Sequence, residues 1–180
     1  MKTNNSFLIW LDLEMTGLDF TKDKIIEIAT IITNKNLDIV EEGPSIAIKQ
    51  DKLILDNMDS WNTFHHKKSG LYDKSLNSTI TCNIAENITL SFIKKYLNKN
   101  ISPMCGNSIH QDRIFLKKYM PTLEQFFHYR NIDVSSIKEL FSYWKKKEYA
   151  LYKKIPSHIA MEDIKESIKE LQYYKRILFS

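Results

Sequence analysis

The sequence predicts an α/β domain built on one mixed β-sheet, which is antiparallel at its start and parallel where helices intervene. Three apolar segments near the N-terminus are joined by short polar turns, as in an antiparallel meander. Segments with helical periodicity then alternate with short apolar ones, which is typical of parallel strands connected through helices. The expected order is β-β-β-α-β-α-β-α. Because no repeat, low-complexity segment or linker interrupts it, we expect residues 1–180 to form a single domain.

The three segments of the meander differ in character. Residues 7–13 form an apolar run with Asp12 near its end, which indicates a buried central strand. Residues 24–33, rich in isoleucine, and residues 39–48 follow as the second and third strands. The dipeptide Gly43-Pro44 interrupts the third one, and a proline inside a strand favours a bulge or an edge position.

Helices and short strands follow the meander. Residues 81–97 place apolar side chains at the spacing of one helical face. The lysine-rich residues 145–149 are expected to be a solvated face or a loop. The other elements expected from such patterns are short helical pieces over 52–69, a strand at 103–106, a helix at 109–119 ended by Pro121, a strand at 132–134, a helix at 137–144, and a last helix from near Ser157 to about Leu178.

The composition bounds the class of protein. Hydrophobic residues make up 43% of the chain and charged residues 27%, which are ordinary proportions for a globular domain. A net charge of +4 allows binding to a polyanion without demanding it. Cys82 and Cys105 lack the spacing of metal ligands, which favours reduced thiols of the cytosol. No apolar run is long enough to span a bilayer. We therefore expect a cytoplasmic protein with no membrane partner.

Arginine is scarce in this chain. The three arginines are Arg113, Arg130 and Arg176, and lysine supplies the rest of the positive charge. A guanidinium contacts phosphate in a bidentate way that an ammonium does not match. Scarcity alone gives a residue no special claim to function, but any guanidinium contact with phosphate must come from one of these three positions.

Asp12 and Glu14 lie two residues apart at the end of the first expected strand. Side chains at positions i and i+2 of a strand point to the same face, so the two carboxylates should converge. Like charges held together raise one another's pKa unless a cation intervenes, and hard oxygen ligands suit Mg²⁺ or Mn²⁺. Taken alone, the pair is also compatible with an acidic strand end beside a solvated neighbour.

Asp112 falls in the first turn of the helix expected at 109–119, just past a short strand. Asp is favoured there by the exposed N–H groups of a helix start, which is a sufficient structural reason for it.

His158 and Asp163 lie at the start of the last helix. A separation of five residues does not put two side chains on one helical face. His158 is therefore expected before the first turn, where it can move, with Ser157 as N-cap and Asp163 in the second turn. A mobile histidine beside an anchored carboxylate suits a base that must reach an attacking water, although a surface histidine is the simpler reading.

The combination of these elements is more informative than any one of them. Four carboxylates, Asp12, Glu14, Asp112 and Asp163, form the ligand set that a two-metal phosphodiester cleavage centre needs. In such a centre one ion activates water and the other, about 4 Å away, stabilises the leaving oxygen. With His158 as the base, the sequence predicts a metal-dependent nuclease.

These elements resemble the DEDDh exonucleases, and within them the oligoribonuclease family very closely. The D-x-E and H-x4-D elements are shared by the wider superfamily, whereas the strings MTGL, CGNSI and HYR are more specific. The resemblance covers essentially the whole chain, and the matching residues are 10–18, 25–29, 105–109, 111–113, 118–121, 128–130, 133–136, 138–140 and 158–167.

The resemblance implies a ribonuclease H-like fold and 3′→5′ hydrolysis of very short RNAs, chiefly dinucleotides, to nucleoside 5′-monophosphates. It implies that His158 is the general base and that two Mg²⁺ or Mn²⁺ ions are bound by the four carboxylates. It also implies a homodimer in which Tyr129 reaches into the partner's site. Leu18 would wedge against the bases, with Trp61 lining the same site. The residues implied to cap the 5′ phosphate of the substrate are Ser108, Arg130, Ser135 and Ser136.

Two positions depart locally from the family pattern. His110 stands where a smaller residue is expected, and we expect a bystander on the helix turn rather than a contact with the metal site. His65 and His66 are expected to be an exposed pair, although His66 could line the site.

Two other functions are compatible with these motifs. One is a related nuclease that acts on longer single strands, such as transfer RNA ends or proofreading substrates. The other is a nucleic-acid-binding module without catalysis, against which the intact set of four carboxylates argues, since it would be a costly cluster of like charge without metal.

Overall fold

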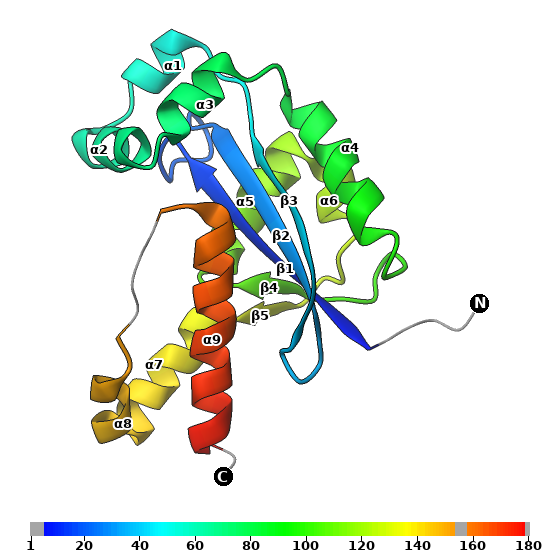
Figure 1. Cartoon of the computed structure of the whole chain (residues 1–180), viewed down its shortest axis with the longest axis vertical. Helices are drawn as coiled ribbons and strands as arrows, with labels where there is room; N and C mark the ends of the chain where they lie inside the picture. Colours follow the sequence, from blue (N-terminus) through cyan, green and yellow to red (C-terminus); the bar gives the residue numbers. More distant parts are fainter. Residues whose placement is uncertain (1–5, 154–157, 179–180) are drawn as a thin grey trace.

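The computed structural model describes residues 6–153 and 158–178 (Figure 1). Its sheet has the strand order β3-β2-β1-β4-β5. β1 (Phe7–Met15), β2 (Ile25–Asn34) and β3 (Ile39–Ala47) are antiparallel neighbours. β4 (Met104–Gly106) and β5 (Asn131–Asp133) pair parallel on the other side of β1. The expected mixed sheet, antiparallel first and parallel later, is therefore confirmed.

Alternation along β1 divides the core into two layers. Ile9, Leu11 and Leu13 belong to a cluster on one face of the sheet, whereas Leu8 and Trp10 belong to a cluster on the other. Since successive strand residues point to opposite faces, positions 12 and 14 share the face of positions 8 and 10. Asp12 and Glu14 therefore lie on the face of β1 that packs against the second cluster.

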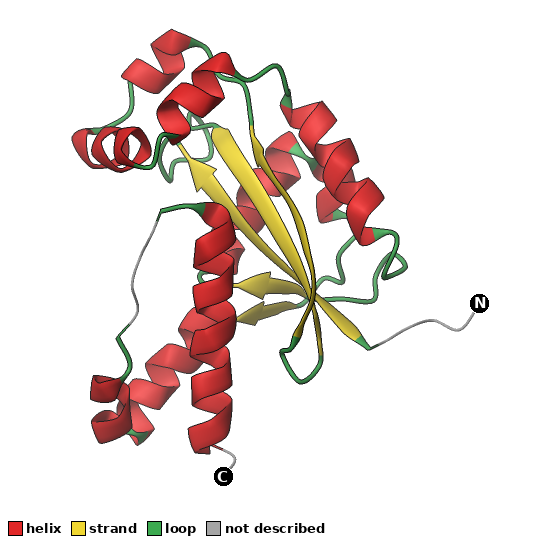
Figure 2. Cartoon of the chain, in the orientation of Figure 1, coloured by secondary structure: helices red, strands yellow, loops and turns green. Residues whose placement is uncertain are grey.

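Helices cover both faces of the sheet (Figure 2). α4 (Cys82–Ile93), α5 (Ile109–Tyr119) and the short α6 (Pro121–Glu124) contribute to the first cluster. α7 (Val134–Trp144) and α9 (Ala160–Leu178) contribute to the second. The face of β1 that carries positions 12 and 14 therefore packs against α9, the last described helix.

Three short helices lie beyond the carboxyl end of β1. These are α1 (Lys52–Asp56), α2 (Ser60–Lys68) and α3 (Leu71–Asn77), which group around the arrowhead of β1 in Figure 1. α1 and α3 bury a small core with Ile26 of β2, which includes Leu55 and Leu71. α2 lies between them in the chain and packs against α3, near the end of the strand that carries the acidic pair.

The expected irregularity in the third strand is present. β3 is an edge strand, and its pairing with β2 shifts register opposite Gly43 and Pro44. A Cβ at position 43 would lie 2.5 Å from the Phe92 ring and 2.5 Å from Thr30 Oγ1. Glycine is therefore required where α4 closes over this strand.

One expectation about the C-terminal third is specified further and another needs correction. Residues 145–149, expected to be a solvated face or loop, lie largely within a short helix, α8 (Lys146–Leu151), which has no buried residue and so presents a solvated face. Tyr149 packs against the second cluster, and the Tyr173 hydroxyl donates to the carbonyl of Glu148 at 2.7 Å, so tertiary contacts order this segment. The last helix begins at Ala160 rather than near position 157, and the N-cap proposed at Ser157 lies outside the described residues.

Across residues 6–153 and 158–178, no helix is both long enough and apolar enough to cross a membrane.

Candidate active site

Three carboxylates converge where β1 meets the start of α9. Asp12, Glu14 and Asp163 each offer an oxygen, and the three oxygens lie within 4.8 Å of one another. The i, i+2 spacing on β1 brings the first two together, as the sequence predicts. Asp163 lies in the first turn of α9, not the second as expected, because the helix starts at Ala160.

Glu27 of β2 holds the start of α9 against the sheet. It lies opposite Glu14 in the antiparallel register and is 5% exposed. Its Oε2 accepts a hydrogen bond from the backbone N–H of Ala160 at 3.2 Å, and its Oε1 accepts one from Ser45 Oγ at 2.8 Å. Sequence reasoning assigned Glu27 no role, although a lone acid inside an isoleucine-rich strand was a visible signal.

Asp112 approaches the same region from the opposite face of the sheet. It lies in the first turn of α5, as expected, and is 5% exposed. Its Oδ1 accepts a hydrogen bond from the backbone N–H of Leu13 at 2.8 Å. Asp112 stands outside the group of three, but its charge acts on Glu14.

Burial and mutual repulsion perturb these carboxyls. Burial, followed by the charges of Asp163, Glu27 and Asp112, raises the pKa of Glu14 to about 8. Burial raises the pKa of Asp112 to about 7, against the opposing effect of the hydrogen bond from Leu13. Each carboxylate thus loses solvation and meets like charge. A cluster of hard oxygen ligands under such repulsion fits a divalent cation such as Mg²⁺ or Mn²⁺.

His158 lies just before α9, as the sequence predicts, with a left-handed backbone at φ 54°. Its ring centre is 4.0 Å from that of His65 and 5.1 Å from that of Trp61, both on α2. A residue with left-handed backbone cannot continue an α-helix, so the side chain of His158 is not in helical register with that of Asp163. The imidazole therefore lies against two rings of α2.

His66 corrects the expectation of an exposed histidine pair. It is 1% exposed, and its Nε2 is 3.0 Å from the carbonyl oxygen of Met15, to which it must donate. Its buried Nδ1 has no hydrogen-bond partner among the described residues. Burial lowers the pKa of His66, partly offset by the bond to Met15. The neutral ring thus fastens α2 to the end of β1.

A groove of about 480 Å³ opens beside Glu14. Leu18 and Trp61 stand on its wall, with 68% and 55% of their surfaces exposed. Large apolar side chains left in solvent at the edge of a groove are suited to contact with flat, apolar ligand surfaces. The residues that line the groove are Leu13, Glu14, Met15, Gly17, Leu18, Asp59, Trp61 and Asn62.

The turn that presents Leu18 is tied by Asp23. The Asp23 carboxylate accepts hydrogen bonds from Thr16 Oγ1 and from the backbone N–H of Asp19, both at 2.9 Å. A Cβ at Gly17 would lie 2.5 Å from this carboxylate, so the close approach requires glycine. Leu18 is thereby held outward by a rigid turn.

Ser108 and Ser135 meet at the carboxyl ends of β4 and β5. The backbone N–H of Ser108 donates to Asp133 Oδ1 and to Ser135 Oγ, both at 2.9 Å, and the two hydroxyl oxygens are 3.0 Å apart. Ser136 follows in the first turn of α7, where Asp133 is the N-cap. The structure thus brings together two of the four residues predicted to cap a phosphate, Ser108 and Ser135.

Arg130, the fourth, lies on the segment that leads into β5. Its guanidinium carbon is 5.3 Å from the centre of the Tyr129 ring, and Tyr129 is 74% exposed. Within the part of the chain that the structure describes, no hydrogen bond joins the Arg130 side chain to Ser108 or Ser135. His110 lies on the serine side, with Nδ1 3.3 Å from Asp133 Oδ2.

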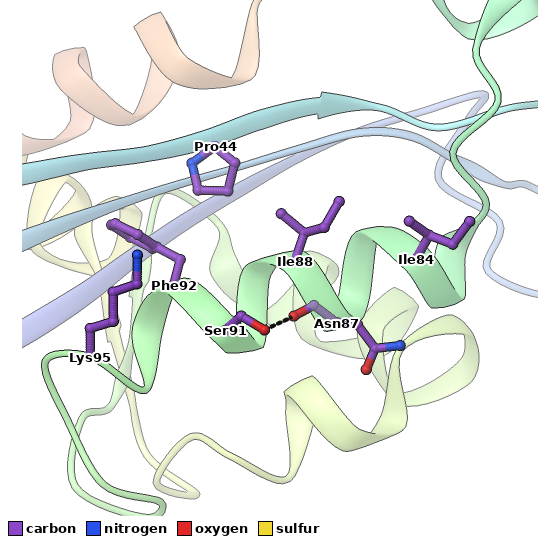
Figure 3. A pocket seen from close by; sticks show the side chains of 7 residues that line it. All are labelled: Pro44, Ile84, Asn87, Ile88, Ser91, Phe92 and Lys95. Atoms are coloured by element: carbon purple, nitrogen blue, oxygen red, sulfur yellow. Dashed lines mark hydrogen bonds between the residues drawn. The ribbon is translucent and has the colours of Figure 1, made fainter.

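A separate groove of about 620 Å³ lies between α4 and β3 (Figure 3). Ile84, Ile88 and Phe92 project from α4 toward it, with Pro44 of β3 above them. Lys95 is its one ionisable lining residue, so this groove lacks the acid–base groups that hydrolysis needs.

Comparison with known proteins agrees with this geometry. Residues 9–171 match the RNase_T family, described as exonuclease. A protein named Oligoribonuclease from Hydrogenovibrio crunogenus is 55% identical over 99% of this chain and 97% of its own length. One of the same name from Acinetobacter baylyi is 54% identical over 98% of this chain and 97% of its own length.

Solved structures of exonuclease I share the fold. One structure of exonuclease I has a TM-score of 0.70 at 13% identity over 95% of this chain. Exonuclease I from Methylocaldum szegediense has a TM-score of 0.68 at 14% identity, also over 95% of this chain. The chain spans 41% and 40% of these two proteins, so the likeness bears on the fold alone. It confirms the predicted α/β arrangement of the ribonuclease H-like type.

Proposed function

Because the chain belongs to the oligoribonuclease family and is a metal-dependent 3′→5′ exoribonuclease, we propose that its substrates are very short RNAs, chiefly dinucleotides. The products are nucleoside 5′-monophosphates. The observation that carries the proposal is the convergence of Asp12, Glu14 and Asp163 within 4.8 Å beside a groove lined by Leu18 and Trp61.

The carboxylates are proposed to hold two divalent ions, Mg²⁺ or Mn²⁺. Asp12, Glu14 and Asp163 form the primary set, and Asp112 approaches from α5. When bound, such ions lower the pKa of water and stabilise charge on phosphate oxygens. The raised pKa of Glu14 supports this role, because a cation relieves the repulsion that keeps the carboxyl protonated.

His158 is proposed to accept the proton of the attacking water. It lies outside the helical path of α9, so its ring can turn while Asp163 stays anchored. Its position just before α9, five residues ahead of Asp163, supports this role, as does its ring contact with His65, 4.0 Å between centres. An imidazole titrates near neutral pH, which suits it to take up and then release this proton.

Leu18 and Trp61 are proposed to contact the bases. Stacking on an apolar or aromatic side chain is tolerant of sequence, because every base has a flat face. The groove they line adjoins Glu14, so a base held there leaves its phosphate near the carboxylates. This arrangement supports hydrolysis without preference for a particular nucleotide.

The serine cluster is proposed to bind the 5′ phosphate of the substrate. Ser108, Ser135 and Ser136 offer hydroxyls at the start of α7, where the positive end of the helix dipole favours an anion. Arg130, from the adjoining segment, would add the charge. A site that grips the 5′ phosphate limits substrate length, because a longer strand has no room beyond it.

A homodimer in the cytoplasm is proposed as the active form, with Tyr129 entering the partner's site. Tyr129 is 74% exposed, which leaves its ring free for another surface. α7 also exposes Leu140, Tyr143 and Trp144 at 44%, 66% and 62%. Such apolar side chains gathered on one helix support a subunit interface.

The test is digestion of 5′-labelled RNAs of two to seven nucleotides in the presence of Mg²⁺. We expect the rate to be highest for the dinucleotide and to fall steeply with length. A rate that is level from two to seven nucleotides would instead support the alternative nuclease for longer strands. No Mg²⁺-dependent hydrolysis at any length would leave only the binding-module alternative.

The cap and the dimer are tested separately. We expect Tyr129→Ala and Arg130→Ala to weaken hydrolysis of dinucleotides more than hydrolysis of a nucleoside 5′-p-nitrophenyl phosphate, which has no second nucleotide. Equal losses on both substrates would count against the cap. A dilution series that yields a fully active monomer would remove the shared site.

A further inference from the structure

Arg113 connects the carboxylate region to the segment that carries Tyr129 and Arg130. It follows Asp112 on α5, and successive helix residues point about 100° apart. Asp112 turns toward β1, where it meets the N–H of Leu13, whereas Arg113 turns toward the residues that precede β5. One turn of α5 therefore contacts both regions.

The guanidinium of Arg113 gathers the backbone of this segment. The three consecutive carbonyl oxygens of residues 128–130 accept from it at 2.7, 2.9 and 3.3 Å. Its Nη1 also donates to Asn131 Oδ1 at 2.6 Å, and its Nε donates to Glu124 Oε1 at 2.9 Å. The Arg113 side chain therefore bonds every residue from 128 to 131, which we call the 128–131 segment.

Burial makes these bonds specific to arginine. The side chain of Arg113 is 10% exposed, and that of Glu124 is 15% exposed. A buried guanidinium keeps its charge and spreads its donors in a planar fork. A lysine offers its donors from one point, so it cannot reach acceptors on three carbonyls and two side chains together.

Asn131 bonds Arg113 through its side chain, whereas the side chains of Tyr129 and Arg130 are outside this anchor. Tyr129 is 74% exposed, and its ring centre is 4.4 Å from that of His128 and 5.3 Å from the guanidinium carbon of Arg130. The carbonyls of the same residues face the buried Arg113. The backbone is thus fixed from within, while the side chains are presented at the surface.

We propose that Arg113 is a positioning residue that holds the 128–131 segment at a set distance from the carboxylates and so determines the substrate length that the enzyme accepts. The inference rests on the proposed function, in which Arg130 contacts the 5′ phosphate and Tyr129 serves the partner's site. The bonds of the Arg113 guanidinium all go to protein atoms, so its proposed role is indirect. Because Asp112 and Arg113 are neighbours on one rigid helix, the cleavage centre and the length-measuring residues are held in a fixed relation.

The test compares Arg113→Lys with Arg176→Lys. Arg176 packs on Tyr173 near the end of α9, 5.5 Å from the ring centre, and serves as a matched control outside the proposed site. KM and kcat are measured for a dinucleotide and for the nucleoside 5′-p-nitrophenyl phosphate. Melting temperatures with and without Mn²⁺ report folding and ion binding.

We expect Arg113→Lys to raise KM for the dinucleotide on the order of tenfold to a hundredfold, since displacements near 1 Å have effects of this size. Hydrolysis of the p-nitrophenyl ester and the Mn²⁺-induced rise in melting temperature should stay close to the parent values. The preference for two nucleotides over four should weaken. Arg176→Lys should change none of these quantities.

A folded Arg113→Lys protein with parental KM and parental length preference would overturn the inference. If Arg113→Lys does not fold, Asn131→Ala and Glu124→Ala decide the question, because each removes one partner of the guanidinium and leaves the rest. Parental kinetics in both would equally refute it, whereas a selective rise in KM for the dinucleotide would support it.

Parallel measurements separate this inference from the proposed function. Tyr129→Ala and Arg130→Ala act on the proposed contacts directly. If those variants leave dinucleotide hydrolysis unchanged, the cap itself is wrong. If they weaken it and Arg113→Lys does not, the cap stands and the role of Arg113 fails alone.

Discussion

The backbone N–H of Leu13 donates a 2.8 Å hydrogen bond to Oδ1 of Asp112, which joins β1 to α5 across 99 positions of sequence. Leu13 stands between Asp12 and Glu14, so this buried bond fixes Asp112 next to both. The bond also satisfies a main-chain donor of β1 beyond Ile9 and Trp10, the residues that pair with β4. The carboxylate of Asp112 therefore has a structural role as well as a proposed ligand role.

A pair of substitutions at Asp112 separates these two roles. Asp112→Asn keeps an acceptor for Leu13 and removes the charge, whereas Asp112→Ala also leaves the buried N–H without a partner. We expect both to reduce hydrolysis at least about a hundredfold, because charge stabilisation by a metal is worth several kcal/mol. Asp112→Ala should be about 1–3 kcal/mol less stable than Asp112→Asn, measured by urea unfolding without metal. Equal stabilities would show that the bond to Leu13 contributes little.

The stability of the metal-free protein should fall as pH rises. The pKa of Glu14 is raised from 4.5 to about 8, and that of Asp112 from 3.8 to about 7. Between the ordinary and the raised value, the folded protein holds a proton that the unfolded chain has released. Each group then lowers the free energy of unfolding by at most about 1.4 kcal/mol per pH unit.

The measurement is the melting temperature from pH 4 to pH 9 in a chelator. We expect a decline that levels off above pH 8 and is reduced in the variant Glu14→Gln. Saturating Mn²⁺ should reverse the decline, since an ion bound only by the folded protein at a hundred times its Kd adds about 2.7 kcal/mol. A metal-free protein whose stability rises between pH 5 and pH 8 would contradict the raised pKa values.

Removing the apolar wall of the groove should weaken substrate binding. Leu18→Ala and Trp61→Ala each delete a proposed base contact, and such contacts are worth about 1–3 kcal/mol. We expect KM for a dinucleotide to rise about fivefold to a hundredfold, with little change in melting temperature because both side chains are exposed. Leu53→Ala, which removes another exposed leucine from the nearby α1, is the control and should leave KM unchanged.

Ser108 should show opposed effects on stability and activity. It holds a left-handed backbone at φ 48°, a conformation that costs a non-glycine residue roughly 1–2 kcal/mol. Ser108→Gly and Ser108→Ala both remove the hydroxyl that meets Ser135, so both should lower dinucleotide hydrolysis. The glycine variant should be about 1 kcal/mol more stable than the alanine variant, measured by thermal unfolding. Equal activity of the parent and both variants would exclude the hydroxyl from phosphate binding.

Periodicity and strand-end chemistry predicted the main elements and most of the site. The i, i+2 spacing of Asp12 and Glu14 specifies their common face, and the helix start at 109–119 specifies the place of Asp112. These features are local, so the sequence contains them. The convergence with Asp163 needs the packing of α9 on β1, which the family resemblance implied and periodicity did not.

Features set by tertiary contact were not predictable in the same way. For residues 145–149 the sequence left a solvated face and a loop open, and the contacts of Tyr149 and Glu148 with the second cluster and Tyr173 favour the helix. His66 looked exposed, but the Met15 carbonyl lies within its reach. The acceptors of Arg113 are mostly backbone carbonyls, which every residue has. No pattern of side chains therefore marks the 128–131 segment as its partner.

The parallel pairing of β1 with β4 also bears on when this enzyme becomes active during its own synthesis. Ile9 pairs with Met104, and Asp12 meets Asp163 only after α9 has begun. Any growing chain that has not yet reached position 163 therefore has an incomplete carboxylate group. A nascent chain that lacks α9 would be unable to hydrolyse RNA, however well its first strands had folded. Cleavage would begin only once Asp163 has been made and α9 has packed on β1, so activity reports that the sheet and its last helix have assembled.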